Sequence, residues 1–382
     1  MCGIIGILGQ REVANDILEG LMRLEYRGYD SAGIATVVNG KMDRLRAEGK
    51  LVNLKKRLDD RSLSGNLGIG HTRWATHGLP TENNAHPHMT DTVAVVHNGI
   101  IENYQDLKTE LETYQFRFET QTDTEVIAHI LTHHLTRLGD PFQAVQESLK
   151  QLKGAFALAI VFSGHTDLMI GARQGTPLAV GFGAMNDNEK REMYLASDSY
   201  ALAQFTKDVC FLEDGDSVVI TSAGARIYDR SGKDIERPIR KTAQSGITTG
   251  KGAYRHFMLK EIYEQPEVIG DTLNSFINPT NNKVQVPEDI LECLVKTPRL
   301  TMIACGTAFY ACMVAKYWFE QVAGLPCEID IASEFRYREA PMPENGVSLF
   351  VSQSGETLDT LEALRYAKSQ DQTILSIVNS IE

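Results

Sequence analysis

The chain opens with the apolar stretch Met1-Cys-Gly-Ile-Ile-Gly-Ile-Leu-Gly9, and this stretch decides how the first half of the sequence is interpreted. Its branched apolar residues are typical of a buried strand. It has no basic region before the apolar run and continues directly into Gln10-Arg-Glu12, so it is a poor secretion signal. Cys2 follows the initiator methionine directly. It is either a small residue at the start of the strand or, once Met1 is removed, a reactive N-terminus.

A cysteine at a free N-terminus carries a nucleophile and a base on the same residue. Its α-amine, with a pKa of roughly 7.7–8.0, can accept the proton of a thiol with a pKa of about 8.5. No histidine has to be recruited, and Cys2 is therefore the candidate nucleophile. The other cysteines are scattered without a CxxC pair, as expected of free thiols in a reducing cytoplasm: Cys210, Cys293, Cys305, Cys312 and Cys327.

Length and composition indicate a globular protein of more than one domain. The chain has 382 residues, of which 42% are hydrophobic and 23% charged. A net charge of −12 argues against a nucleic-acid partner but leaves room for a small anionic substrate, because a narrow site sets its own local field. No apolar run reaches the roughly 18 residues that span a bilayer. We therefore expect a cytoplasmic protein with no membrane segment.

The first 228 residues alternate short β-rich runs with helical patterns. The runs are bounded by Gly, Asn and Asp and cover residues 34–38, 92–96, 155–162 and 217–221. The clearest helical pattern opens at Thr122, where Glu125 would complete a capping box, and ends at Gly139-Asp-Pro141.

A change of composition predicts the domain boundary. Residues 230–252 are poor in large apolar residues and rich in Gly, Ser, Thr and Lys, which is typical of a linker. We predict a first domain over 1–240, a linker over 241–253 and a second domain over 254–382. The second domain should begin with a helix from Tyr254 to Gln265 that stops at Pro266.

The second domain then repeats strand–turn–helix units, which predict a parallel sheet covered on both faces. The predicted strands are 300–304, 327–331 and 347–351, with helices around 313–321, 333–339 and 358–368. A last strand, Thr373–Val378, has no following helix, so we expect that the sequence is truncated within this domain.

Five further blocks follow the Met-Cys-Gly-Ile-Ile-Gly opening in order. They are Tyr26-Arg-Gly-Tyr-Asp-Ser-Ala-Gly33, His71-Thr-Arg-Trp-Ala-Thr-His-Gly78, Asn84-Ala-His-Pro-His88, His97-Asn-Gly99 and Thr122-Asp-Thr-Glu125. Together they resemble the class II glutamine amidotransferases, which are N-terminal-nucleophile hydrolases. The "YRGYDSAG" and "RWATHG" blocks resemble, within that class, the glutamine–fructose-6-phosphate aminotransferases. The resemblance implies an αββα sandwich in which Cys2 hydrolyses glutamine without a metal or an organic cofactor.

The blocks supply chemistry that fits each part of glutamine. Arg73 has a planar fork suited to the carboxylate, and Asp123 can take the ammonium, although an aspartate at a helix start is also a common cap. In the family the corresponding residues do these two jobs. Asn98 and Gly99 fit an oxyanion hole made of a side-chain amide and a backbone N–H. An Asn-Gly hairpin turn between strands is the alternative.

Other residues of these blocks carry weaker expectations. Trp74, Thr76 and His77 resemble the family's mobile loop, which closes over bound glutamine. We expect Arg27 to be structural, with its charge satisfied by local carbonyls or by Asp30.

Two histidine pairs could in principle bind a metal. They are His129 with His133, and His86 with His88, and neither pair has a carboxylate or cysteine at ligand spacing. His129 and His133 lie largely off the apolar face of their helix. We therefore predict a solvated face there and no metal site.

Two strand-to-helix turns of the second domain carry small hydroxyl residues. They are Cys305-Gly-Thr-Ala308 and Ser352-Gln-Ser-Gly-Glu-Thr357. Free N–H groups at a helix start can bind an anion, although Ser and Thr are also preferred caps. Both turns follow strands of one parallel sheet, at the edge where such folds bind ligands.

The second turn and residues 254–266 extend the resemblance to the whole chain. "SQSGET" resembles the signature of sugar isomerase (SIS) domains, and "YRHFMLKEIYEQP" resembles the connector of the aminotransferases. The resemblance implies a partial αβα SIS domain whose sugar-phosphate contacts are Thr307, Ser352, Gln353, Ser354 and Thr357. The family usually has serine where this chain has Ala308, so phosphate affinity should be weaker unless a backbone N–H or water substitutes.

For the full-length protein, the resemblance implies a homodimer that converts L-glutamine and fructose 6-phosphate to glucosamine 6-phosphate and L-glutamate, the first step of hexosamine synthesis. The family's second isomerase lobe is missing, so we expect only glutaminase activity from this chain. An amidophosphoribosyltransferase would need an acidic phosphoribosyl-diphosphate loop in place of "SQSGET". A non-catalytic sugar-phosphate sensor would not need Cys2, Arg73 and Asn98.

Overall fold

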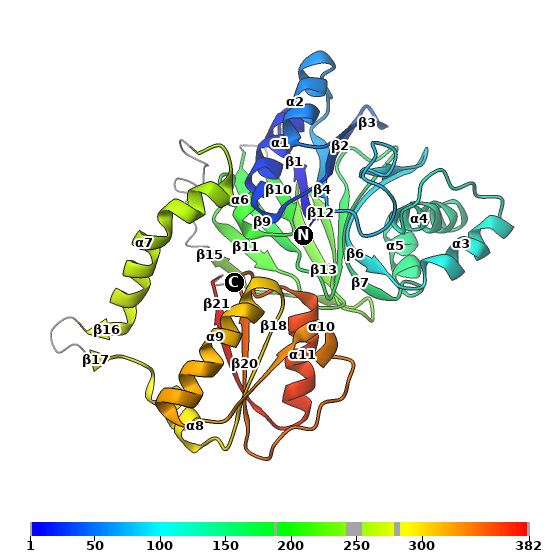
Figure 1. Ribbon diagram of the computed structural model, residues 1–382. Coiled ribbons are helices and arrows are strands. Elements are labelled where there is room, and N and C mark those ends of the chain that lie inside the picture. Colours follow the sequence, from blue (N-terminus) through cyan, green and yellow to red (C-terminus); the bar gives the residue numbers. More distant parts are fainter. Residues whose placement is uncertain (1, 187–188, 242–253, 279–282, 380–382) are drawn as a thin grey trace. The chain divides into compact units, whose positions relative to one another are not determined.

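The computed structural model describes residues 2–186, 189–241, 254–278 and 283–379 (Figure 1). The chain divides into two compact units, Met1–Gly250 and Lys251–Glu382. The predicted linker over 241–253 lies outside the described residues, except for Lys241. That residue instead ends the strand β15 (Ile239–Lys241), which pairs with a strand of the first unit.

The first unit contains two antiparallel sheets. The eight-stranded sheet has the order β15-β11-β9-β10-β1-β4-β2-β3, and the seven-stranded sheet has the order β14-β13-β12-β8-β7-β6-β5. In the first sheet the further strands are β1 (Gly3–Leu8), β2 (Ser31–Val38), β3 (Lys41–Glu48), β4 (Leu67–Arg73), β9 (Ala179–Met185), β10 (Arg191–Ala196) and β11 (Asp208–Phe211). In the second they are β5 (His88–Met89), β6 (Val93–Ile101), β7 (Gly154–Phe162), β8 (Met169–Gln174), β12 (Ser217–Thr221), β13 (Gly224–Tyr228) and β14 (Asp234–Ile235).

The opening stretch forms a central strand of the first sheet. β1 lies between β10 and β4, and every one of its residues is buried. Because side chains alternate across a strand, Ile4 enters the core between the two sheets, whereas Ile5 and Ile7 enter the core under the helices. A strand buried on both faces needs an apolar run without polar alternation, and the sequence from Gly3 to Leu8 supplies it.

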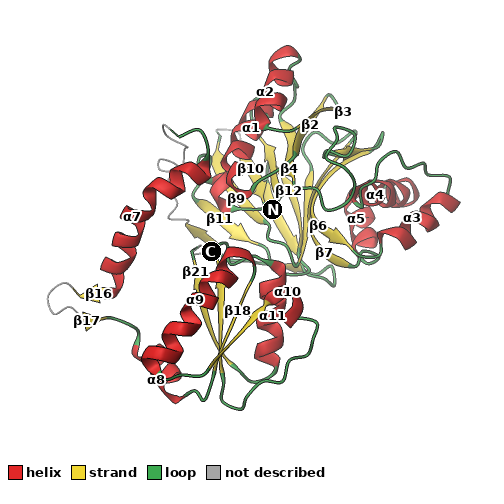
Figure 2. Ribbon diagram, viewed as in Figure 1, coloured by secondary structure: helices red, strands yellow, loops and turns green. Residues whose placement is uncertain are grey.

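Helices cover the outer face of each sheet of the first unit. On the first sheet lie α1 (Ala14–Arg23), α2 (Leu51–Asp60) and α6 (Ser199–Leu202), and on the second lie α3 (Tyr104–Thr113), α4 (Thr124–Leu138) and α5 (Pro141–Leu149). One apolar core lies between each sheet and the helices that cover it, and a third core lies between the two sheets. Figure 2 shows the helices of this unit outside the two sheets. The αββα sandwich is therefore confirmed.

The predicted capping box at the start of α4 is wrong. The helix begins at Thr124, one residue later than a cap at Thr122 implies, and its N-cap residue Asp123 makes no side-chain cap bond. Glu125 instead accepts hydrogen bonds from the backbone N–H groups of Glu119 and Thr120, both at 2.8 Å. The predicted end of the helix is confirmed, because Gly139 takes the left-handed conformation, with φ of 70°, that terminates many helices.

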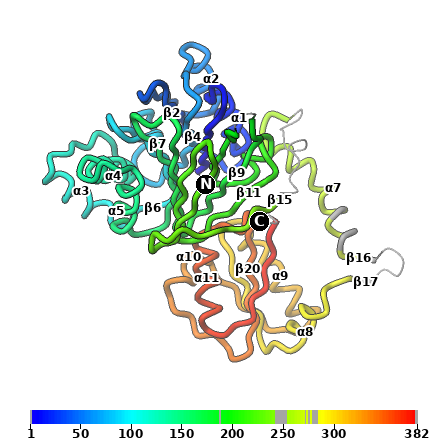
Figure 3. Tube along the Cα trace, turned by 180° about the vertical axis from the view of Figure 1, so that it is seen from behind, coloured from blue at the N-terminus to red at the C-terminus, as the bar shows by residue number. Residues whose placement is uncertain are grey.

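The second unit contains a four-stranded parallel sheet in the order β19-β18-β20-β21. The strands are β18 (Leu300–Ala304), β19 (Cys327–Ile331), β20 (Val347–Ser352) and β21 (Thr373–Val378). The helices α8 (Glu288–Lys296) and α9 (Gly306–Ala323) pack against one face of the sheet. On the other face lie α10 (Ala332–Phe335) and α11 (Leu358–Ser369), as Figures 1 and 3 show from opposite sides. The predicted αβα parallel sheet is confirmed.

Two helices of the second unit differ from the prediction. α7 (Phe257–Phe276) continues through Pro266, where we expected it to stop. Pro266 is exposed, so solvent can hydrate the carbonyl that loses its N–H donor. α10 is a single turn, much shorter than the helix predicted over 333–339. Between α7 and α8 lies a small antiparallel pair, β16 (Ile277–Asn278) and β17 (Lys283–Val284).

Candidate active site

Four elements of the first unit bring the predicted glutamine residues to one cavity. Cys2 immediately precedes β1, Arg73 ends β4, Asn98 and Gly99 lie in β6, and Asp123 precedes α4. β1 and β4 run antiparallel, with Gly3 opposite Thr72, so the first residue of one is beside the last residue of the other. The cavity is lined by Cys2, Arg73, Trp74, Thr76, His77, Gly99 and Asp123, among others. Asn98 contacts Cys2 directly.

The Cys2 thiol is held by the backbone of Trp74. Its Sγ accepts a hydrogen bond from the Trp74 N–H at 3.1 Å and lies 3.5 Å from the Trp74 carbonyl oxygen. Burial raises the pKa of the thiol above its usual value, and the Trp74 N–H and the Arg73 charge only partly oppose this effect. The thiol is therefore protonated at neutral pH, and a base must accept its proton before it can attack.

Asn98 and Gly99 lie inside a strand, so the hairpin-turn alternative is wrong. Both are paired with β7, Asn98 with Ala157 and Gly99 with Phe156. The Asn98 Nδ2 donates to the Cys2 carbonyl oxygen at 3.3 Å, which places a side-chain amide beside the nucleophile. Gly99 has φ of 122°, and a Cβ there would lie 2.0 Å from the Ala155 carbonyl oxygen. Only glycine fits this position.

Arg73 and Asp123 are both engaged with backbone groups. The buried Arg73 guanidinium donates to the carbonyl oxygens of His77, Gly78 and Leu79, the last at 3.2 Å. Its fork therefore holds the 74–79 loop in this structure. The Asp123 Oδ2 accepts the Ile101 N–H at 2.9 Å and makes no helix-cap bond, so the cap alternative for this side chain is wrong.

The cavity around Cys2 is too small to hold glutamine in this structure. Its volume is about 10 Å³, which is room for one water molecule at most. The Trp74 ring lies against the backbone of Gly28, where a Cβ would come within 2.4 Å of the indole. The ring is still 54% exposed, so the loop covers the cavity with one face of Trp74 in solvent.

The two hydroxyl-bearing turns of the second unit lie side by side. They follow β18 and β20, which are adjacent and parallel, with Ala304 opposite Val351. Ser352 and Ser354 accept the backbone N–H groups of Gly355 and Glu356 at 3.2 and 3.1 Å. These bonds lie within the turn, and neither α9 nor α11 has a side-chain cap.

The remaining predicted residues of this edge are Thr307, Gln353 and Thr357. Thr307 and Gln353 are exposed, and the Thr357 Oγ1 lies 3.4 Å from the Ser352 Oγ. The methyl group of Ala308 packs against the core under α9.

Comparisons with known proteins found matches to both units of the chain. Residues 71–204 match the model of the glutamine amidotransferase domain, and residues 293–382 match the model of the SIS domain. The chain is 56% identical over 379 residues to the glutamine–fructose-6-phosphate aminotransferase (isomerizing) of Brucella abortus, and 53% identical to that of Bradyrhizobium diazoefficiens. Each match covers 99% of this chain and 61% of the relative.

In sequence, the chain is similar to the glutamine–fructose-6-phosphate aminotransferases over nearly all of its own length. It spans about 61% of the length of these curated relatives. In structure it is similar to the glutamine phosphoribosylpyrophosphate amidotransferase of Bacillus subtilis, with a TM-score of 0.52 over 99% of this chain and 82% of that one. Their sequence identity is 20%, so this likeness shows the fold alone.

This amidotransferase unit contains an arginine among the early blocks whose side chain is only 7% exposed. Arg27 forms an ion pair with Asp198, and the Tyr26 hydroxyl donates to the same carboxylate at 2.7 Å. The prediction that Asp30 is the partner of Arg27 is therefore wrong. Asp30 instead accepts the Ala75 N–H at 2.5 Å and lies 4.0 Å from Arg73, so it anchors the start of the 74–79 loop.

The histidines of α4 do not form a solvated face. The His129 ring lies 4.7 Å from Phe118 and 5.1 Å from Phe116, and His133 stacks on Tyr114 at 4.5 Å, measured between ring centroids. Aromatic neighbours explain why these residues can lie off the apolar stripe and still be partly buried. Among the described residues, no group of three or more His, Cys, Asp or Glu side chains is arranged to hold a metal ion.

Sequence reasoning missed a set of buried polar residues behind Asn98: His71, His86, His97 and Thr124. Three of the quoted blocks contain these histidines, and Thr124 lies in a fourth. The available signal was that His71, His97 and Thr124 each lie within two residues of a predicted site residue, whereas His86 has none in its block. No periodicity indicates that the four are buried together.

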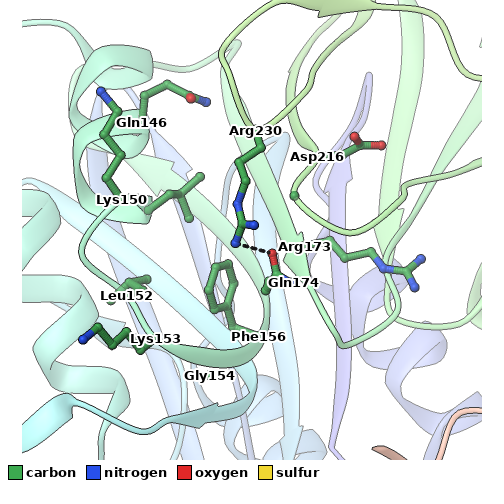
Figure 4. A pocket seen from close by; sticks show the side chains of 12 residues that line it. Gln146, Lys150, Leu152, Lys153, Gly154, Phe156, Arg173, Gln174, Asp216 and Arg230 are labelled. Carbon is green, nitrogen blue, oxygen red and sulfur yellow. Dashed lines mark hydrogen bonds between the residues drawn. The ribbon is translucent and has the colours of Figure 1, made fainter. Parts of the chain in front are cut away.

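A second, larger cavity lies elsewhere in the amidotransferase unit (Figure 4). Its volume is about 550 Å³, and it lies between the end of α5, the start of β7 and the end of β8. The Arg230 guanidinium and the Gln174 side chain join across it at 3.2 Å, above the Phe156 ring. None of the predicted site residues lines it. No helix among the described residues is long and apolar enough to cross a membrane.

Proposed function

We propose that the amidotransferase unit hydrolyses L-glutamine with Cys2 as the nucleophile, after removal of Met1. The observation that carries this proposal is the position of the Asn98 amide, whose Nδ2 lies 3.3 Å from the Cys2 carbonyl oxygen beside the thiol. Attack on an amide carbon turns the oxygen of that amide into an oxyanion, and a hydrogen-bond donor beside the nucleophile can stabilise the developing charge. The relatives' name, glutamine–fructose-6-phosphate aminotransferase, supports glutamine as the substrate.

The proposed reaction uses only groups of this cavity. The Cys2 α-amine accepts the thiol proton, and Sγ attacks the side-chain amide carbon of glutamine. Asn98 Nδ2 and the Gly99 N–H donate to the oxyanion. The intermediate expels ammonia, which takes the proton from the α-amine, and leaves a γ-glutamyl thioester. Water then attacks the thioester, releases glutamate and restores the thiol.

Substrate binding is assigned to the charged groups of the same cavity. We propose that Arg73 binds the carboxylate of glutamine and Asp123 its ammonium. Trp74, Thr76 and His77 would then close over the substrate. Because the Arg73 guanidinium now donates to the carbonyls of residues 77–79, the carboxylate has to replace these partners. Substrate binding and loop rearrangement are thus linked.

For the whole protein we propose transfer of the ammonia to fructose 6-phosphate, giving glucosamine 6-phosphate in the cytoplasm by a homodimer without nucleic-acid partner or cofactor. The relatives' name and the SIS match support this proposal. Thr307, Ser352, Gln353, Ser354 and Thr357 are proposed to bind the sugar phosphate at the carboxyl edge of the parallel sheet. We also propose residues 1–240 and 254–382 as the two functional domains, joined by residues 241–253.

Glutamate release by the purified chain, with and without fructose 6-phosphate, tests the glutaminase. We expect release that Cys2→Ala abolishes and that Cys293→Ala, a partly buried cysteine of the other unit, leaves unchanged. Mass spectrometry should show that Met1 is absent. Near-normal release by a folded Cys2→Ala protein contradicts the proposal. For the whole protein, glutamine labelled with ¹⁵N in its side-chain amide should give ¹⁵N-labelled glucosamine 6-phosphate.

A further inference from the structure

Behind Asn98 lies a continuous series of buried polar side chains. It runs from His97 through Thr124 and His86 to His71, and each of the four is at most 4% exposed. Consecutive members are within hydrogen-bond distance: His97 Nδ1 to Thr124 Oγ1 at 3.0 Å, Thr124 Oγ1 to His86 Nε2 at 2.9 Å, and His86 Nδ1 to His71 Nδ1 at 2.9 Å. The series ends with His71 Nε2 at 2.9 Å from Asn98 Oδ1.

The last of these contacts sets which end of the Asn98 amide faces Cys2. With Oδ1 on His71, the Nδ2 group donates to the Cys2 carbonyl, and the oxyanion site has a donor. If the amide were turned by 180°, an oxygen lone pair would face the oxyanion and oppose its formation. The productive orientation therefore requires a proton on His71 Nε2.

A neutral histidine has one donor and one acceptor nitrogen, so fixing the proton of His71 also fixes the proton of the next ring in the series. Burial lowers the pKa of His71 to about 3 and the pKa of His86 well below its usual value, so each ring carries one N–H. With Nε2 as its donor, His71 must accept at Nδ1, and His86 must then donate from Nδ1. A longer contact of 3.2 Å joins His86 Nδ1 to His71 Nε2, but that nitrogen already donates to Asn98. His86 Nε2 is left as an acceptor.

The Thr124 hydroxyl decides the direction of the whole series. It has one proton, and three acceptors compete for it: His86 Nε2 at 2.9 Å, an unprotonated His97 Nδ1 at 3.0 Å, and Asp123 Oδ1 at 3.5 Å. Donation to His86, at the shorter distance, gives the productive direction, and His97 Nδ1 then donates to the hydroxyl oxygen. Donation to Asp123 or to His97 would reverse the contacts from Thr124 through His86 and His71 to Asn98 and turn the Asn98 amide round.

We propose that His97, Thr124, His86 and His71 form a one-directional hydrogen-bond relay that orients the side-chain amide of Asn98 as an oxyanion donor. These four are positioning residues, since none of them needs to touch the reacting atoms. The inference deepens the proposed function and rests on it through the role of Asn98. It also links substrate to catalysis. A glutamine ammonium on Asp123 would occupy the competing acceptor and so favour the productive direction.

Histidine tautomers test the relay without any activity measurement. In protein labelled with ¹⁵N-histidine, two-bond ¹H–¹⁵N spectra distinguish Nδ1–H from Nε2–H rings, and single His→Gln variants assign the signals. We expect Nε2–H for His71 and Nδ1–H for both His86 and His97, unchanged between pH 6 and 8. An Nδ1–H or doubly protonated His71 overturns the relay. This result stands whether or not the chain hydrolyses glutamine, so failure of the proposed function is recognised separately by absent glutamate release.

A double-mutant cycle tests whether the relay acts through Asn98. Thr124→Val keeps the shape of the side chain but removes its hydroxyl, and we expect kcat to fall about tenfold with KM nearly unchanged, less than the 10²–10³ of losing the donor itself. In an Asn98→Ala background the same substitution should have no further effect on kcat. An equal loss in both backgrounds, or no loss in either, overturns the proposal.

Two further comparisons separate positioning from packing. Thr36→Val replaces another buried threonine, whose hydroxyl has no hydrogen-bond partner among the described residues, and should leave kcat unchanged. His71→Gln retains an N–H close to the Nε2 position, so it should preserve most of the kcat that His71→Leu loses. Equal kcat for the two His71 variants would overturn the role of the Nε2 proton.

Discussion

At the scale of single residues, Asn98 and Arg73 are built for different stages of the proposed reaction. The Asn98 amide points at the Cys2 carbonyl from within a paired strand, so its position is fixed before substrate arrives. Arg73, in contrast, makes hydrogen bonds that substrate must replace. One residue is therefore preorganised for the transition state, and the other exchanges partners on binding.

We predict that Asn98→Ala lowers the kcat of glutamate release by about 10²–10³ with little change in KM, because the amide acts mainly on the oxyanion. Steady-state kinetics on the purified variant measure both constants. A change confined to KM would reassign Asn98 to substrate binding.

For Arg73 the expected pattern is the opposite. Arg73→Ala should raise KM steeply, and Arg73→Lys should raise it too, because lysine keeps the charge but loses the planar fork that matches a carboxylate. The two variants are compared by the same assay. A normal KM for Arg73→Lys would mean that charge alone is needed.

At the scale of elements, the 74–79 loop depends on the segment between α1 and β2. Gly28 has φ of 77° and lies against the Trp74 ring, where a Cβ would come within 2.4 Å of the indole. Asp30, two residues later, accepts the Ala75 N–H. The closed loop is thus shaped by residues far from it in sequence.

Gly28→Ala should disturb the loop more than the fold. We expect a backbone cost of about 1–3 kcal/mol, because Gly28 combines φ of 77° with ψ of 146°, a region that is nearly confined to glycine. We also expect about a tenfold fall in kcat/KM because the Trp74 ring must move. Gly139→Ala is the matched control, since Gly139 has φ of 70° and nothing within 4 Å of its Cβ position. It should cost about 1–2 kcal/mol of stability, because φ of 70° and ψ of −3° are the left-handed helical conformation, and leave kcat/KM unchanged. Equal activity losses in the two variants would contradict this account.

Local sequence patterns predicted those elements whose signals are local. The apolar runs at 217–221 and 373–378 are strands with those bounds, and Gly139 ends α4 as expected. The failures depend on context that a sequence pattern does not contain. Solvent hydrates the carbonyl left free by the exposed Pro266, strand pairing keeps Asn98-Gly99 extended, and tertiary contacts bury histidines from separate blocks. Hydrogen-bond partners such as Asp198 for Arg27 come from distant segments and have no signal in local sequence.

At the scale of the whole molecule, the buried histidines make the amidotransferase unit sensitive to acid. Burial lowers the pKa of His71 to about 3, and it also lowers the pKa values of His86, His88 and His97. Below the ordinary histidine pKa of about 6.5, these side chains bind protons in the unfolded chain but stay neutral in the folded unit. The free energy of unfolding therefore falls as pH drops from about 6.5 towards 3.

We predict a loss of about 1.4 kcal/mol per pH unit below 6.5 for each such histidine. Urea unfolding at pH 7.5 and 5.5 measures it, and Trp318→Phe leaves Trp74, in the amidotransferase unit, as the only tryptophan of the chain. His88→Phe should make the pH dependence shallower, because one proton acceptor of the unfolded state is gone. Equal urea midpoints at the two pH values would contradict the prediction.

The small volume of the cavity at Cys2, about 10 Å³, has a kinetic consequence. Glutamine cannot enter this state, so association must wait for a spontaneous excursion to an open form. At high glutamine concentration the observed association rate should level off at the opening rate instead of rising linearly, and the apparent affinity should be reduced by the small open fraction. Stopped-flow fluorescence of Trp74 in a Cys2→Ala, Trp318→Phe protein would reveal that ceiling. Gly28→Ala should raise this limiting rate, because the added Cβ displaces the Trp74 ring from its contact with residue 28.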